Sequence, residues 1–164
     1  MADHRVIKGL KWALFFDGEW PASIPRSKPK GVRAKGIRYE KAVSAALPGA
    51  DHGRWIEFED ENGHGLAQPD ILFRHNGALV ILECKLTWTP KGHTQISQLY
   101  APLLRSMGAT KIKELVICKN LVPDIPFPVF TDLGEALESK CESAVVHWIG
   151  AGPLFLTLPA IPIT

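Results

Sequence analysis

The spacing of apolar and polar residues predicts three consecutive β-strands in the middle of the chain. Residues 54–60, RWIEFED, alternate in the way that is typical of a half-buried strand. Residues 66–74 and 78–86 are apolar over most of their length, and the dipeptide Asn76-Gly77 between them is typical of a tight hairpin turn. We therefore expect an antiparallel meander of three strands in this region.

Helical spacing predicts a helix on either side of this meander. The first covers residues 35–47 and ends at Pro48-Gly49. The second follows the loop TPKGH at 89–93, and its apolar residues recur at helical spacing until Gly108. A helix, three strands and a second helix are thus expected to follow one another.

The remaining elements extend this unit at both ends. Residues 114–118, ELVIC, predict a buried strand, and TDLGEALESK at 131–140 predicts a helix with Thr131 as its N-cap. The apolar C-terminus predicts one or two further strands, for which a sheet edge is one possible place. Two short apolar runs around Asp17-Gly18 predict a hairpin. The expected fold is a mixed α/β sandwich in one domain, with a hairpin and basic arm at 1–34, an αβββαβ core at 35–119 and a helix with strands at 120–164.

The composition is typical of one globular, intracellular domain. At 164 residues the chain is long enough for one core and too short for two ordinary domains. The N-terminus lacks the apolar stretch of a secretory signal, and glycines and prolines interrupt the apolar C-terminus, so we expect no membrane association. The three cysteines include no C-x-x-C pair, which argues against disulfide or zinc frameworks. A reducing compartment is expected, such as the cytoplasm or nucleoid, or a phage-infected cell.

Positive charge is concentrated before and within the first predicted helix. The net charge is only +2, but residues 26–41 hold seven basic residues and a single acid. Such a segment suits the phosphates of DNA, although charge runs are often no more than solvated, flexible segments. The candidate nucleic-acid-binding residues are Arg26, Lys28, Lys30, Arg33, Lys35 and Arg38.

Three charged side chains interrupt the apolar hairpin. Glu83 and Lys85 share one face of their strand, whereas Leu82 and Cys84 point to the other. Counting outward from the hairpin turn places Asp70 nearly opposite Glu83. Two carboxylates at this separation raise each other's pKa unless a positive charge lies between them. A divalent metal ion would supply that charge, and Lys85 would add a further one.

The ligand types indicate which metal and which reaction to expect. Carboxylate oxygens completed by water suit Mg²⁺ or Mn²⁺ rather than zinc. Such an ion lowers the pKa of a bound water and takes up charge on a phosphoryl oxygen. Hydrolysis of a phosphodiester bond is the reaction that uses all of these parts.

The hairpin resembles the signature of the PD-(D/E)XK nuclease superfamily, which has the restriction-endonuclease-like fold. It contains Pro69-Asp70, then twelve residues, then Glu83-Cys84-Lys85. The αβββαβ core of that family is similar to the order predicted for residues 35–119. The resemblance implies a metal-dependent deoxyribonuclease that leaves 5′-phosphate and 3′-hydroxyl ends, in repair, recombination or the processing of mobile-element and phage DNA. The apolar tail would pair with a second copy in a homodimer, as is common in this fold, or belong to the ordinary core.

The resemblance also implies roles for individual residues. Asp70 and Glu83 would bind Mg²⁺ or Mn²⁺ together with the backbone carbonyl of Cys84. Lys85 would position or activate the attacking water and stabilise charge in the transition state. Asp70, Glu83 and Lys85 are therefore the expected catalytic core.

Glu40 is the candidate for an acid that the family often adds from the first helix. It falls on the apolar stripe of its helix, where an unpartnered carboxylate would be costly. A metal, a bound water or a neighbouring basic residue must satisfy it, and a plain salt bridge is the alternative. Glu57 and Glu59 are less favoured as the third acid.

Members similar to the RecB-like and phage exonuclease branches carry a glutamine, often followed by a tyrosine, on the helix after this strand. The sequence HTQISQLY at 93–100 offers Gln95 and Gln98, and neither has the usual Q-x-x-x-Y spacing to Tyr100. Gln95 borders the apolar stripe and Gln98 falls opposite it, so we favour Gln95 as an auxiliary catalytic residue. The subfamily stays open between these branches and one resembling Holliday-junction resolvases.

Other interpretations remain open at this level. The three charged residues of the hairpin could form a structural ion-pair cluster on a solvent-facing sheet. The chain could also be a non-catalytic nucleic-acid-binding protein that keeps the fold, or a protein-interaction domain that uses its apolar C-terminus. His64 and His93 could line the cleft or be ordinary surface residues.

Overall fold

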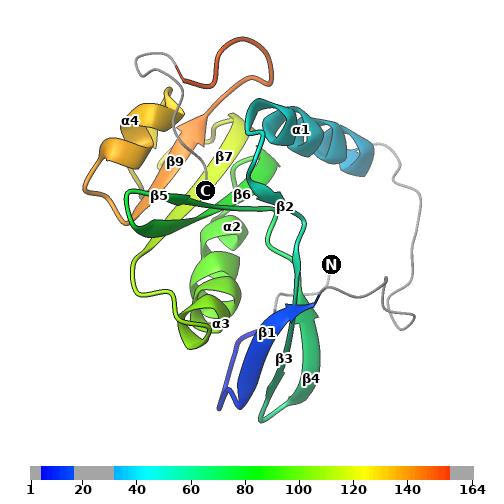
Figure 1. Ribbon diagram of the computed structural model, residues 1–164. Helices are drawn as coiled ribbons and strands as arrows, with labels where there is room; N and C mark the ends of the chain where they lie inside the picture. Colours follow the sequence, from blue (N-terminus) through cyan, green and yellow to red (C-terminus); the bar gives the residue numbers. More distant parts are fainter. Residues whose placement is uncertain (1–4, 17–31, 156–164) are drawn as a thin grey trace.

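The computed structural model describes residues 5–16 and 32–155 and shows a mixed α/β fold with two β-sheets (Figure 1). The elements follow in the order β1 (Trp12–Phe16), α1 (Val32–Ala46), β2 (Asp51–His52), β3 (Trp55–Asp60), β4 (Gly63–Ala67), β5 (Ile71–His75), β6 (Ala78–Thr87), α2 (Pro90–Gln95), η1 (Ile96–Tyr100), α3 (Ala101–Ser106), β7 (Ile112–Asn120), β8 (Val129–Phe130), α4 (Leu133–Glu138) and β9 (Ser143–His147). The turn η1 is π-helical, and α2, η1 and α3 follow one another without a break. The α/β class that the sequence predicts is confirmed.

The larger sheet has six strands in the order β2-β5-β6-β7-β9-β8. β5 and β6 form an antiparallel hairpin whose turn residues Asn76 and Gly77 have φ values of 49° and 80°, so the predicted turn is confirmed. The helical segment α2-η1-α3 then carries the chain to β7, which runs parallel to β6. Such a crossover is needed because parallel neighbours cannot be joined by a tight turn. β9 pairs with β7 in the same parallel direction.

The smaller sheet corrects the predicted three-strand meander. The strand predicted at 54–60 is present as β3, but it pairs with β1 and β4 in a separate antiparallel sheet, which lies apart from the larger sheet in Figure 1. The strand predicted at 66–74 is in fact two strands, because residues 68–70 carry the chain from one sheet to the other. Pro69 lies in this crossing and has no N–H with which to continue a ladder. The short strand β2 takes the place beside β5.

The N-terminal predictions are met only in part. The apolar run at 12–16 forms β1, whose partner is β3. The rest of the predicted hairpin, from Asp17-Gly18 onward, and the basic arm at 26–31 lie outside the described residues. The first helix begins at Val32, three residues before the predicted start.

Two apolar cores cover the two faces of the larger sheet. On one face, Val43 and Leu47 of α1 pack with Leu82 of β6, together with residues of α4. On the other face, Ile96 and other residues of the segment α2-η1-α3 pack with Ile81 of β6 and with the small sheet. The central strands are therefore apolar on both sides, as is usual where parallel strands are covered by helices. Within the described ranges, no helix is both long enough and apolar enough to cross a bilayer.

The C-terminal third differs from the prediction in two details. The N-cap of α4 is Asp132, whose Oδ1 accepts a hydrogen bond from the Gly134 N–H at 3.0 Å, and not Thr131. The predicted terminal strand is present as β9, but it lies inside the sheet, and the two-residue β8 forms the edge beside it. The sequence analysis missed β8, because a strand of two residues leaves no alternation to detect.

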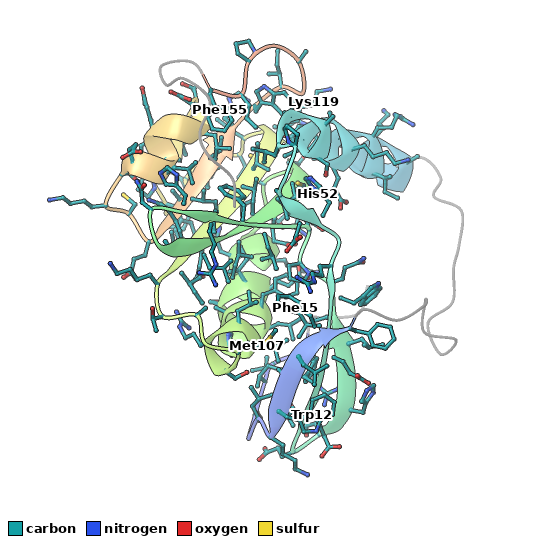
Figure 2. All side chains as sticks on the ribbon, viewed as in Figure 1. Trp12, Phe15, His52, Met107, Lys119 and Phe155 are labelled. Carbon is teal, nitrogen blue, oxygen red and sulfur yellow. The ribbon has the colours of Figure 1, made fainter. Side chains whose placement is uncertain are left out.

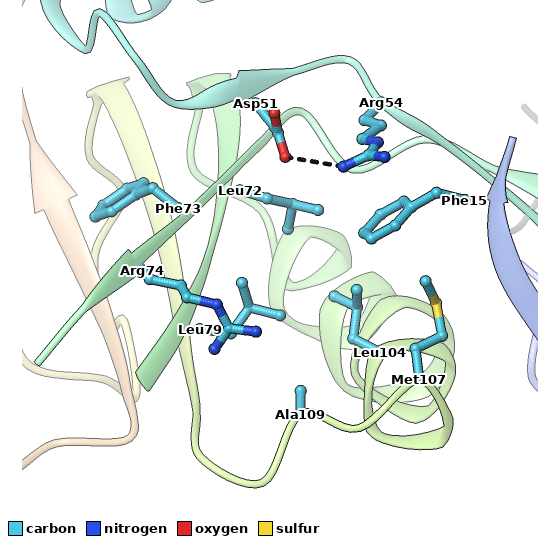
Figure 3. A pocket seen from close by; sticks show the side chains of 10 residues that line it. All are labelled: Phe15, Asp51, Arg54, Leu72, Phe73, Arg74, Leu79, Leu104, Met107 and Ala109. Carbon is cyan, nitrogen blue, oxygen red and sulfur yellow. Dashed lines mark hydrogen bonds and ion pairs between the residues drawn. The ribbon is translucent and has the colours of Figure 1, made fainter. Parts of the chain in front are cut away.

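A small pocket marks the place where the two sheets meet. It has a volume of about 240 Å³, and Phe15 of β1 faces Leu104 and Met107 across it (Figure 3). The Arg54 guanidinium lies 3.8 Å from the centroid of the Phe15 ring and 3.4 Å from Asp51 Oδ2. Through these two contacts, Arg54 links β1 of the small sheet to β2 of the larger sheet.

Candidate active site

The candidate site lies where β6 extends beyond its antiparallel neighbour. β5 pairs with β6 only as far as Leu82, whereas β7 pairs with β6 as far as Thr87. One edge of β6 is therefore free of β5 from Glu83 onward. Continuing the register from the Ile71–Leu82 pair places Asp70 opposite Glu83, as the sequence predicts.

Two hydrogen bonds continue across this gap by using carboxylates. The backbone N–H of Asp70 donates to Glu83 Oε1 at 2.8 Å, and the backbone N–H of Cys84 donates to Asp70 Oδ2 at 2.8 Å. Each carboxylate thus occupies a position where a ladder carbonyl would otherwise accept. Among the described residues, neither side chain forms an ion pair within 4.0 Å, so backbone N–H groups hold both in place.

The backbone carbonyl of Cys84 lies on the same free edge. In an antiparallel ladder, the N–H and C=O of one residue point to the same side of the strand. Since the Cys84 N–H points to Asp70, its carbonyl points away from β7 as well. The Cys84 side chain packs against the core under α1. Burial, and after it the Asp70 charge, raises the pKa of the thiol well above its usual value.

Helix α1 brings a third carboxyl group to the same place. Glu40 lies one turn before Val43, which is fully buried against the sheet, and its carboxyl is within hydrogen-bonding reach of the Asp70 carboxyl. Among the described residues, no ion pair within 4.0 Å involves Glu40. The alternative of a salt bridge to a neighbouring basic side chain is therefore not observed.

Burial raises the pKa values of the three acids, and repulsion from Asp70 adds to the shift at Glu40 and Glu83. The pKa of Glu40 rises to about 7, first because of burial and then because of the Asp70 charge, with Lys85 opposing the shift. Burial raises the pKa of Asp70 even though the Cys84 N–H and the Lys85 charge act against it. Burial and the Asp70 charge raise the pKa of Glu83 well above its usual value, and Glu83 is only 3% exposed. The site holds more negative charge than its surroundings neutralise.

Lys85 approaches these acids from the same strand as Glu83. It lies two residues after Glu83, so both side chains point to the face of the sheet that α2 covers. A Cβ atom placed on Gly92 of α2 would lie 2.9 Å from Val116 Cγ2 and 3.6 Å from Lys85 Cε. The missing side chain at Gly92 therefore lets α2 pass close above the lysine stem. Among the residues that the structure describes, Lys85 forms no ion pair within 4.0 Å.

The π-helical turn explains the unusual glutamine–tyrosine spacing. Gln95 Nε2 donates to the Tyr100 hydroxyl at 2.8 Å, and that hydroxyl donates to the Gln68 carbonyl at 3.1 Å. Tyr100 lies five positions after Gln95, and the turn that spans this interval is η1. A π-turn brings residues i and i+5 together, whereas an α-turn brings residues i and i+4 together. Gln98, the alternative glutamine, is exposed.

These side chains line one open cavity of about 630 Å³. Its walls come from α1, from the crossing at 68–70, from the end of β6 and from the start of the α2-η1 segment. The structure thus brings together all the residues that the sequence analysis assigned to catalysis or metal binding, which are Glu40, Asp70, Glu83, Cys84, Lys85 and Gln95. Sequence reasoning missed the Gln68 carbonyl, because a main-chain acceptor leaves no signal in the sequence.

Other candidates lie away from this cavity. Glu57 pairs with His64 at 2.6 Å and Glu59 pairs with Lys11 at 3.3 Å, both on the small sheet, so neither supplies the third acid. His93 is buried, with its ring stacked on Phe127 at 3.8 Å between centroids.

The basic residues are only partly accounted for. Lys35 and Arg38 line a neighbouring groove. Arg26, Lys28 and Lys30 lie outside the described residues, as does the side chain of Arg33.

The donor set fits a hard divalent cation. Within the described part of the chain, no three His, Cys, Asp or Glu side chains form a ready coordination shell. Asp70, Glu83 and the Cys84 carbonyl nevertheless supply the oxygen ligands that Mg²⁺ or Mn²⁺ prefers. A cation at this place would favour the ionised form of the buried acids and so oppose the rise in their pKa values.

Comparisons of the chain with family models, with curated proteins and with solved structures found no match. Its function has to be inferred from the cavity and the side chains that line it.

Proposed function

We propose that the protein is a metal-dependent nuclease that hydrolyses DNA phosphodiester bonds, similar to the PD-(D/E)XK nucleases. The observation that carries this proposal is the convergence of three carboxyl groups and one lysine in a single open cavity. They come from α1, from the segment before β5 and from β6, so no local sequence feature requires them to meet. Three buried acids that share a single lysine are costly to folding, which favours a functional reason for them.

Each residue of the site has a defined part in this reaction. Asp70, Glu83 and the Cys84 carbonyl would hold Mg²⁺ or Mn²⁺, with Glu40 as an auxiliary ligand or as the acceptor for a metal-bound water. The ion would activate a water and take up negative charge on the phosphoryl group. The Lys85 ammonium can hold the attacking water and stabilise the charge that develops on the phosphate. Gln95, oriented by Tyr100, can position the water or a phosphate oxygen.

The alternative interpretations receive less support. A structural ion-pair cluster on an exposed sheet does not fit a buried Glu83. A non-catalytic nucleic-acid-binding protein would use Lys35 and Arg38 but would not need the three acids. The apolar residues 156–164, on which a protein-interaction role would depend, lie outside the described part of the chain.

A cleavage assay tests the proposal. Purified protein is incubated with linear duplex, nicked, branched and single-stranded DNA in the presence of Mg²⁺, Mn²⁺ or EDTA. We expect cleavage only with a metal ion, and we expect Lys85→Ala to lower its rate by about 10²-fold or more, the usual effect of losing a group that stabilises transition-state charge. Lys91→Ala is the matched control, because Lys91 is an exposed lysine of α2 that does not line the cavity.

The result that would contradict the proposal is equally clear. If the unmodified protein cleaves none of the substrates with either metal, the enzyme interpretation is wrong. Binding of Mn²⁺, measured by calorimetry, gives a second readout that does not depend on activity. Asp70→Asn should abolish that binding, and Asp51→Asn, a change of an exposed acid outside the cavity, should leave it unchanged.

A further inference from the structure

A second hollow continues the catalytic cavity along the ends of the parallel strands. This groove has a volume of about 480 Å³, and Leu86 at the end of β6 lines both hollows. Asn120 at the end of β7 forms its floor and donates through Nδ2 to the Leu86 carbonyl and to Thr87 Oγ1, both at 3.3 Å. Because Thr87 also lines the catalytic cavity, the floor of the groove is continuous with the site.

The two walls of the groove are fixed to each other. One wall is α1, and the other is the loop after β9 that contains Ile149 and Gly150. The Tyr39 hydroxyl of α1 donates to the Trp148 carbonyl at 2.8 Å, and a Cβ atom on Gly150 would lie 3.6 Å from the Tyr39 ring. The groove is thus a preformed channel beside the carboxylates. Ligands of open α/β sheets commonly bind at this end, beyond the carboxyl ends of the strands.

The groove is positively charged. Lys35 and Arg38 reach it from α1, and Lys119 reaches it from the end of β7, where Figure 2 shows it beside α1. All three side chains are exposed, and among the described residues none of them forms an ion pair. No acidic side chain of the described residues lines the groove. The catalytic cavity is rich in acids, so the charge changes sign from one hollow to the next.

An apolar side chain stands on the rim of this cationic groove. Ile149 is 62% exposed, the highest value among the exposed large hydrophobic residues of the described chain. Binding of phosphates alone would not require an apolar side chain such as Ile149, whereas a base or a sugar offers an apolar surface that Ile149 can contact. Proteins that bind single strands combine a cationic groove along the backbone with apolar or aromatic contacts to the bases.

We propose that this groove binds a single-stranded stretch of the nucleic acid next to the phosphate that is cleaved. Lys35, Arg38 and Lys119 contact successive phosphates, and Ile149 packs against an unpaired base or sugar. The proposal rests on the proposed nuclease function, because that function places a phosphodiester at the acidic end of the groove. An acidic protein segment would match the charges, but it would leave Ile149 and the neighbouring site without a role.

Binding without cleavage tests this proposal. Fluorescence anisotropy in EDTA compares a labelled single strand of about 16 nucleotides with a blunt duplex and with a duplex that carries a single-stranded overhang. The unmodified protein is expected to bind the single strand and the overhang more tightly than the blunt duplex. Lys119→Glu should weaken single-strand binding about tenfold at low salt and lower the salt slope by about 0.7, the value for one lost phosphate contact.

Lys140→Glu is the matched control for Lys119→Glu. Lys140 is also an exposed lysine, but it lies in a separate basic hollow with Lys111 and Arg105, away from the site. The two variants change the net charge equally, so only the groove distinguishes them. If both variants weaken binding to the same extent, bulk charge is responsible and the proposal is wrong.

Ile149→Ser examines the apolar contact. It should reduce the preference for single strands over blunt duplex about threefold to tenfold, which corresponds to the loss of a modest apolar contact, and leave the salt slope unchanged. Val129→Ser, at another exposed apolar residue, should leave the preference unchanged. A preference of the unmodified protein for blunt duplex would overturn the proposal. So would displacement of the strand by polyglutamate as readily as by an unlabelled oligonucleotide, because that result would favour an acidic protein segment.

The outcome is separable from that of the cleavage assay. If Lys119→Glu loses single-strand binding while the unmodified protein cleaves nothing, the groove assignment holds and the nuclease proposal fails. If the protein cleaves DNA and Lys119→Glu binds single strands normally, the nuclease proposal holds and the groove assignment fails.

Discussion

Two buried acidic regions of this protein differ in how their charge is balanced. Asp60, at the end of β3, is 0% exposed, and it pairs with Arg5 and accepts the backbone N–H groups of Asn62 at 2.9 Å and Lys8 at 3.2 Å. Burial alone would raise the pKa of Asp60, but these donors lower it below its usual value. The acids of the candidate site share one nearby lysine and have raised pKa values.

This difference separates a structural acid from a candidate functional one. Asp60 has its counter-charge within the chain, and Arg5 also donates to the carbonyl of Gly63 at 2.7 Å and to that of His64 at 2.9 Å, so the pair fastens the N-terminal segment to the small sheet. In the cavity, Asp70 and Glu83 are held by backbone N–H groups, Glu40 contacts the Asp70 carboxyl, and none of the three forms an ion pair among the described residues. A cation from solution would balance the charge of the cavity acids, whereas Arg5 already balances the charge of Asp60.

The largest expected effect is on catalysis and comes from a change to one of the cavity acids. Asp70→Asn should lower metal-dependent cleavage by about 10³-fold or more, because it removes a proposed metal ligand and leaves a neutral amide oxygen in its place. In the metal-free protein the same change should cost little stability, since the amide oxygen can still accept the Cys84 N–H and a repulsive charge is lost. Single-turnover cleavage and urea unfolding in EDTA measure the two effects. Cleavage at the unmodified rate, or unfolding of the variant without denaturant, would contradict the functional interpretation of the cavity acids.

The second effect is on stability at the complete region. Asp60→Asn should lower the free energy of unfolding by about 2 kcal/mol or more, because it leaves the Arg5 guanidinium without its buried partner. Cleavage by the folded variant should be unchanged. Glu59→Gln is the control, since its pair with Lys11 is exposed and should contribute less than about 1 kcal/mol. Equal losses in the two variants, measured by urea unfolding, would mean that the Asp60 pair is no stronger than a surface pair.

The two regions should also respond to pH in opposite directions. The Glu40 pKa is raised from 4.5 to about 7, so between these values the folded protein holds its proton more tightly than the unfolded chain does. Without metal, this acid therefore makes the protein less stable as the pH rises through that range. The Asp60 pKa is lowered, so the contribution of Asp60 is present at neutral pH and is lost only on acidification.

Urea unfolding in EDTA at about pH 5 and about pH 8 measures this difference. The loss of stability between the two values should be smaller in Glu40→Gln than in the unmodified protein. Added Mn²⁺ should restore stability at the higher pH, because the cation takes the place of the proton. Identical pH dependence in both proteins would show that Glu40 does not titrate in this range.

The sequence could predict the parts of the site that depend on local rules. The turn at Asn76-Gly77 sets the register of the hairpin, which places Asp70 directly across from Glu83. The alternation of side chains along a strand then places Glu83 and Lys85 on the same face of the sheet. The predicted position of Glu40 on the inner face of α1 follows from helical spacing in the same way.

The sequence could not predict features that depend on the rest of the fold. The apolar run at 66–74 gives no measure of how far one strand extends, and Pro69 was the one sign that the chain leaves the small sheet there. Thr131 and Asp132 are both good N-cap residues, so the choice between them depends on where α4 begins. The π-turn at 96–100 has no signature in residue type, because it differs from an α-turn only by one extra residue.

The smallest expected effect comes from removing that extra residue. Deletion of Ser97, an exposed residue within η1, should turn the π-turn into an α-turn and give Gln95 and Tyr100 the spacing of one α-turn. The hydrogen bonds from Gln95 to Tyr100 and from Tyr100 to Gln68 would persist. Gln95 would therefore keep its orientation in the cavity beside the acids. Cleavage should stay within about threefold of the original rate and stability within about 1 kcal/mol, the range of a tolerated surface change.

Deletion of Lys91 is the control, because that residue is exposed in the α-helical first turn of α2. Removing a residue from an α-turn rotates its neighbours by about 100° around the helix axis. Gly92 would then no longer lie over Val116 and Lys85, where a Cβ atom does not fit. This deletion should therefore reduce both stability and cleavage. If the two deletions are equally harmful, the π-turn is not a one-residue insertion in an otherwise α-helical segment. The orientation of Gln95 in the cavity would then depend on the π-turn itself.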